Sequence, residues 1–134
     1  MYINQTTKQK IAALVKPVCK KYGIKASFAV RNHMSLVMTI KSGKIDFIES
    51  FVRTSKKNYP HNFDASRVIK DVDVNPYWYH NQFDGLALEF FNEVFPLLNV
   101  DNYDNSDVQS DYFDRGYGVD VRCGNWNKPY ILEA

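Results

Sequence analysis

Residues 26–41 read ASFAVRNHMSLVMTIK, and apolar and polar side chains alternate on both sides of the triplet at 32–34. Phe28 and Val30 come before the triplet, and apolar residues return at every second position of 36–40. A period of two is typical of half-buried strands, and Asn tolerates the left-handed conformation that a tight turn needs. The stretch predicts an antiparallel hairpin with strands at 26–31 and 35–41.

A helix is predicted immediately before the hairpin. Residues 6–22 place apolar side chains at the spacing of one buried helix face. We expect Thr6 or Thr7 to cap its start, and Gly23 to take the left-handed conformation after its end. Pro17 lies inside the pattern and predicts a kink or a second start there.

Helical and strand patterns continue after the hairpin. Residues 44–57 and 85–99 have helical apolar spacing, and Asp84 is the expected N-cap of the second helix. A short strand is predicted at 72–74, and strict alternation predicts another within 112–123. The chain is therefore expected to be α+β, with an antiparallel sheet of about four or five strands and helices packed on it.

A weak repeat suggests how these elements are organised. The pattern Val-x-Pro-apolar occurs at 15–18 and at 94–97, each time inside a predicted helix that strand signals follow. It allows two α-β-β units, 1–57 and 84–134, within a single domain of residues 1–134. Chance accounts for two matched prolines equally well.

Composition excludes several classes of protein. A chain of 134 residues with 45% hydrophobic content suits one folded domain rather than a disordered segment. Cys19 and Cys123 are expected to be reduced thiols, with one long-range disulfide as the alternative. No apolar run approaches the length of a membrane span, and no signal-peptide pattern is present, so we expect a cytoplasmic protein with no membrane contact.

The net charge of +2 conceals an asymmetry between the two halves. Residues 1–70 hold 14 basic and three acidic residues, and residues 71–134 hold three basic and 12 acidic ones. Three interpretations remain open. The halves neutralise each other within the fold, the basic half binds nucleic acid, or the acidic half binds a basic protein surface.

An aromatic segment, residues 77–80, and an acidic run, residues 101–114, are the candidate contacts with a partner protein. Tyrosine and tryptophan give large contact area at low entropic cost, although they could equally cover the core. The acidic run could bind Arg or Lys side chains, remain a solvated loop, or hold a cation, but it lacks the glycine of a calcium-binding loop. The partner-binding candidates are Tyr77, Trp78, Tyr79, His80, Asp104, Asp107 and Asp111.

Basic residues around the hairpin are the candidates for nucleic-acid binding, because a basic β-ribbon can lie along a nucleic acid. The alternative is a solvated edge whose lysines discourage aggregation. These candidates are Arg31, His33, Lys41 and Lys44.

No motif for catalysis or for a cofactor is found. Gly116-Tyr117-Gly118 lacks the third glycine of a dinucleotide-binding loop and precedes a strand rather than a helix. The three histidines, at 33, 61 and 80, are too widely spaced to predict a metal site. We therefore expect neither a metal nor a cofactor, and no catalytic residue is assigned.

Several short segments carry a resemblance. They are 20–25, 30–33, 39–47, 74–80, 104–107 and 111–114. Together they resemble small uncharacterised proteins of tailed bacteriophages and related mobile elements, and the front half is similar to a domain associated with large polyvalent proteins of such elements. The resemblance implies expression in the host cytoplasm and an accessory role, but it brings no known activity.

The leading hypothesis is a phage-type accessory protein that binds an unidentified host or phage protein through its aromatic segment and acidic run, without catalysis. The alternative is a nucleic-acid-binding protein that uses the basic N-terminal half. An enzyme with an unrecognised site is the lesser alternative.

Overall fold

A computed structural model describes residues 3–58, 69–100, 117–125 and 127–133. These residues form helices and strands in the order α1 Gln5–Tyr22, β1 Ile24–Arg31, β2 Ser35–Gly43, α2 Phe47–Asn58, β3 Val72–Val74, α3 Tyr79–Gln82, α4 Gly85–Leu98, β4 Gly118–Cys123 and β5 Ile131–Leu132. The α+β class is confirmed, and the predicted hairpin is present as β1 and β2.

The sheet is mixed, which corrects the expectation of an antiparallel one. Its order is β1-β2-β4-β3, with β5 beside β2. The β1–β2 and β3–β4 pairs are antiparallel, but β4 and β5 both run parallel to β2. The physical reason is the connection: helices and β3 separate β2 from β4, and a long crossover can return a strand in the same direction.

In the second proposed α-β-β stretch, the described strands β4 and β5 each pair with β2 rather than with each other. After β4 the chain turns away at Gly124, whose φ is +73° and whose N–H donates to the Ile40 carbonyl. It returns at Tyr130, and β5 then continues along the same side of β2. Strands from both halves of the sequence therefore share one sheet around β2.

Helix α1 ends where the sequence predicts but begins differently. Asn4, not Thr6 or Thr7, is the N-cap, and its side chain accepts a hydrogen bond from the Thr7 N–H. Gly23 follows the helix with φ +70°, as expected. Pro17 lies within one continuous helix, on an exposed face.

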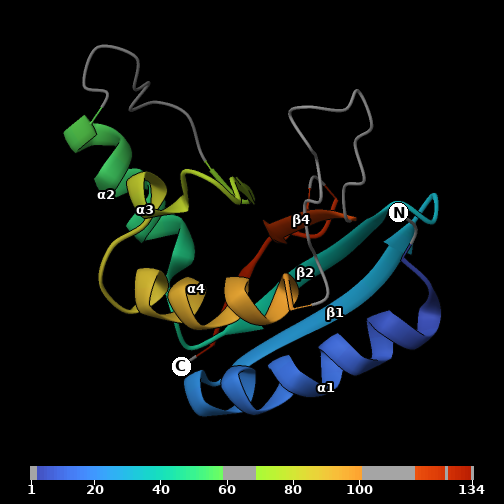
Figure 1. Ribbon diagram of the computed structural model, residues 1–134. Coiled ribbons are helices and arrows are strands. Elements are labelled where there is room, and N and C mark those ends of the chain that lie inside the picture. The colour runs from blue at the N-terminus through green and yellow to red at the C-terminus, as the bar shows by residue number, and fades with distance from the viewer. Residues whose placement is uncertain (1–2, 59–68, 101–116, 126, 134) are drawn as a thin grey trace, which may run out of the picture.

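One face of the sheet supports the core. Leu36, Met38 and Ile40 of β2 are fully buried, whereas Lys41 is exposed. Helix α1 lies along β1, and α4 packs against α1 (Figure 1). At the α2 end of this core, the buried Phe47 ring contacts four other aromatic rings. They are Phe83, Phe90, Phe91 and Tyr130.

Candidate functional site: an aromatic pocket between α2 and α3

The aromatic segment begins in a turn that side chains hold in place. Asn75 Oδ1 accepts hydrogen bonds from the Tyr77 N–H at 2.8 Å and the Trp78 N–H at 3.1 Å. Gln82 Oε1 accepts from the Asn75 N–H at 2.7 Å, and its Nε2 donates to the Asp73 carbonyl. Asn favours such turns because its side chain can replace a backbone acceptor. The backbone that carries Trp78 is therefore fixed before any ligand arrives.

The four aromatic candidates divide into two groups. Tyr79 is half-buried and stacks on Phe95, with the ring centroids 4.5 Å apart. Tyr77 and Trp78 are 80% and 59% exposed, and the His80 side chain lies beside Trp78 with centroids 6.1 Å apart. Tyr79 therefore covers the core, whereas Tyr77 and Trp78 face solvent, and partner binding by these two side chains stays a prediction.

A pocket of about 510 Å³ lies between α2 and this turn. Its lining residues are Phe51, Ser55, Asn75, Trp78, Asn81 and Gln82. They combine aromatic surface with amide and hydroxyl groups, a composition typical of recognition sites. These described lining residues do not change charge near neutral pH, and they offer a ligand hydrogen bonding and apolar contact.

The two α2 residues that line this pocket could not be recognised from the sequence. Phe51 and Ser55 lie on α2, more than 20 residues before Trp78, and no local pattern connects them to it. Asn81 and Gln82 carried a weak signal, since three amides stand within eight residues beside the aromatics. Only the packing of α2 against α3 brings the walls together.

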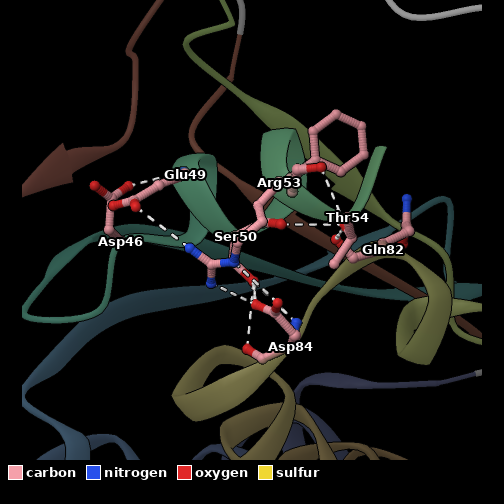
Figure 2. Close-up of polar contacts among 8 residues, drawn as sticks. Asp46, Glu49, Ser50, Arg53, Thr54, Gln82 and Asp84 are labelled. Atoms are coloured by element: carbon pink, nitrogen blue, oxygen red, sulfur yellow. Dashed lines mark hydrogen bonds and ion pairs between the residues drawn. The ribbon is translucent and has the colours of Figure 1, made fainter. Parts of the chain in front are cut away.

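The Asp84 carboxylate clamps α2 to the start of α4 (Figure 2). Arg53 on α2 donates to it through Nε at 3.0 Å and through Nη2 at 2.6 Å. Ser50 donates its hydroxyl to Asp84 Oδ1 at 2.9 Å and accepts from the Asp84 N–H. These hydrogen bonds, with Arg53 the larger cause, lower the pKa of Asp84 to about 2. Asp84 occupies the N-cap position as predicted, but its side chain binds α2 instead of capping α4.

A second link holds α2 against α3. The Thr54 hydroxyl is buried and donates to the Gln82 carbonyl (Figure 2). Gln82 also fixes the Asn75 turn. The hydrogen bonds that hold α2 against α3 and those that hold the turn therefore form one network along the pocket. Networks of this kind set side-chain positions in advance, which lowers the entropic cost of binding.

The hairpin candidates do not form one basic patch. Arg31 and His33 lie at the tip of the β1–β2 hairpin, whereas Lys41 and Lys44 lie at the other end of β2. At roughly 3.3 Å per residue the ends are about 20 Å apart. Arg31 is also paired with Asp120 on β4.

The charge asymmetry is partly neutralised within the fold. Lys21 pairs with Glu93, Lys25 with Glu133, Arg31 with Asp120 and Arg53 with Asp84. Each of these pairs joins the basic half of the sequence to the acidic half. Internal neutralisation therefore accounts for part of the asymmetry. Asp104, Asp107 and Asp111 lie outside the described residues.

Comparison with protein-family models, with curated proteins and with solved structures finds no match. Among residues 3–58, 69–100, 117–125 and 127–133, no helix is both long and apolar enough to cross a bilayer. The same residues bring together no group of three His, Cys, Asp or Glu side chains that could hold a metal ion. Cys19 and Cys123 are free and buried.

Proposed function

We propose that the protein is a non-catalytic protein-binding module and that the pocket beside Trp78 is its contact site. The observation that carries the proposal is an exposed Trp78 on a turn that Asn75 and Gln82 hold rigid. Tryptophan and tyrosine are enriched at binding hot spots. Because these hydrogen bonds fix the backbone of the turn, binding need not order that backbone, which lowers the entropic cost.

The chemistry of the pocket fits a peptide segment with one apolar side chain. Phe51 and Trp78 supply the apolar surface. The Ser55 hydroxyl and the Asn81 side-chain amide form no hydrogen bond with another described residue, so they are available to a ligand. A peptide backbone offers both donors and acceptors that an amide and a hydroxyl can satisfy.

The resemblance to phage proteins supplies the setting of the proposal. The partner would be a host or phage protein in the cytoplasm of an infected bacterium, and the protein would act as an accessory factor. Nucleic-acid binding through the hairpin has weaker support, because Arg31 is already paired with Asp120 and the other basic candidates are dispersed.

Affinity capture with two matched variants tests this site. Trp78 and Leu86 are both 59% exposed, but only Trp78 lines the pocket. We expect a bacterial protein captured by the wild type to be retained by Leu86→Ala and lost by Trp78→Ala, with unchanged circular dichroism in both. Retention of every captured protein by Trp78→Ala would show that the assignment is wrong.

Tryptophan fluorescence then tests direct contact. The chain has two tryptophans, Trp78 and Trp126, so Trp126→Phe leaves Trp78 as the only tryptophan, which is excited at wavelengths that tyrosine does not absorb. Adding the purified partner should shift the emission to shorter wavelength, because binding removes the indole from water. A mobility shift with duplex DNA that weakens steeply with salt, in the absence of any protein partner, would favour nucleic-acid binding instead.

A further inference from the structure

Strand β1 lies at the edge of the described sheet. It pairs with β2 on one side, and no described strand pairs with its other side. An unpaired edge presents N–H and C=O groups to solvent at alternate residues, and such edges accept an additional strand. β1 runs for eight residues, Ile24–Arg31, so its edge is long enough for several hydrogen bonds.

A groove runs beside this edge. Helix α1 lies alongside β1 (Figure 1), and the space between them is about 510 Å³. Ala12, Lys16 and Lys20 line it from α1, and Ala26 and Phe28 line it from β1. The side chains at the floor are apolar, and two lysines stand along the helix side.

Two lysines of the groove have no ion-pair partner among the described residues. Lys21 and Lys25 are each paired with a glutamate of the rear half. Lys16 and Lys20 form no ion pair with any described residue, and no described carboxylate lines the groove, although Lys25, which also lines it, is paired with Glu133. A ligand that places carboxylates beside Lys16 and Lys20 gains attraction and displaces no partner that the described part of the chain provides.

We propose that the edge of β1 binds an extended acidic peptide segment of a partner protein, which adds a strand to the sheet beside α1. Successive side chains of a strand point to opposite faces. Apolar side chains of the ligand would therefore enter the groove over Ala26 and Phe28, and the alternate positions would be Asp or Glu. This surface is distinct from the Trp78 pocket and does not depend on its function.

Fluorescence anisotropy with a defined probe tests the proposal. The probe is a fluorescein-labelled peptide, Asp-Val-Asp-Val-Asp-Val-Asp, and its comparison peptide carries N-methyl groups at alternate residues, which remove hydrogen-bond donors but keep the charge. We expect the parent peptide to bind and the N-methylated peptide to bind at least about tenfold more weakly. Equal binding of both peptides would overturn strand addition.

Four variants of the full chain locate the site. Lys16→Glu with Lys20→Glu should weaken peptide binding about tenfold or more, whereas the matched control Lys8→Glu with Lys41→Glu should change it less than about twofold. Ala12→Phe fills the groove without changing charge and should abolish binding. Trp78→Ala should leave binding unchanged, which separates this surface from the pocket.

Other occupants give different results. A single-stranded DNA of equal charge that binds more tightly than the peptide, with the same loss in Lys16→Glu with Lys20→Glu, would overturn the proposal in favour of nucleic acid. Concentration-dependent dimerisation in sedimentation experiments that Ala12→Phe abolishes, with no peptide binding, would show that a second copy occupies the edge. Equal peptide binding by all the charge variants would also overturn it.

Discussion

Replacing Asp84 by Asn tests the clamp between α2 and α4. The change keeps the shape of the side chain but removes the charge that Arg53 contacts. Arg53 is the main cause that lowers the pKa of Asp84 from 3.8 to about 2, and each tenfold change in acidity is worth about 1.36 kcal/mol. The lowering of the Asp84 pKa from 3.8 to about 2 therefore corresponds to about 2.5 kcal/mol of stabilisation before solvent screening is considered. Because the Asp84 side chain is 44% exposed, solvent screening reduces our expectation to about 1 kcal/mol.

The contribution of Asp84 to stability depends on pH, because folding lowers the pKa of its carboxyl group. Because the pKa of Asp84 is lower in the folded protein than in the unfolded chain, its contribution is fully present above about pH 4 and is lost as the pH falls through about 2. We expect Asp84→Asn to lower the free energy of unfolding by about 1 kcal/mol at pH 7. The difference from the wild type should shrink towards zero as the pH approaches 2.

Urea unfolding followed by circular dichroism at pH 7, 4 and 2.5 measures this difference. Glu49→Gln is the control, because Glu49 contacts the same Arg53 in an exposed pair four residues away along α2. Such pairs contribute about 0.3–0.5 kcal/mol. A deficit in Asp84→Asn that does not exceed the control, or that persists undiminished in acid, would refute the clamp.

Two further outcomes are expected. Phe47→Ala should cost about 3–5 kcal/mol in urea unfolding, because its ring is fully buried among four aromatic rings; a cost below about 1 kcal/mol would contradict the packing. Cys19 and Cys123 should react with a thiol reagent far more slowly in the folded protein than in urea, because burial raises the pKa of Cys19 to about 11 and also raises that of Cys123. Rapid labelling of the folded chain would count against this burial.

The β1–β2 hairpin and its turn were predicted correctly from the sequence. Asn32 and His33 have φ of 55° and 59°, in the left-handed region that Asn was expected to tolerate. The register pairs Phe28 with Met38, so both fall on the same side of the sheet. Alternation and turn chemistry are local properties, and neighbouring strands joined by a short turn have little choice of direction.

The candidate site was only partly predictable. The aromatic segment was singled out from its composition, but its division into the core-facing Tyr79 and the exposed Trp78 depends on Phe95, which lies on a different helix. Asp84 was placed correctly as an N-cap position, yet its carboxylate turns to Arg53. In each case a distant side chain competes with the local interaction, and the sequence gives no measure of that competition.

Local patterns were enough to predict the β1–β2 hairpin, the helices α1, α2 and α4, the strands β3 and β4, and the end of α1. They predicted neither α3 nor β5. Long-range packing sets the direction of β4 parallel to β2, leaves β1 at the edge beside α1, and brings Phe51 and Ser55 to Trp78. Alternation is identical in parallel and antiparallel strands. The direction of a strand and the identity of its neighbours are therefore set by how the intervening helices pack, which depends on contacts between residues far apart in the chain.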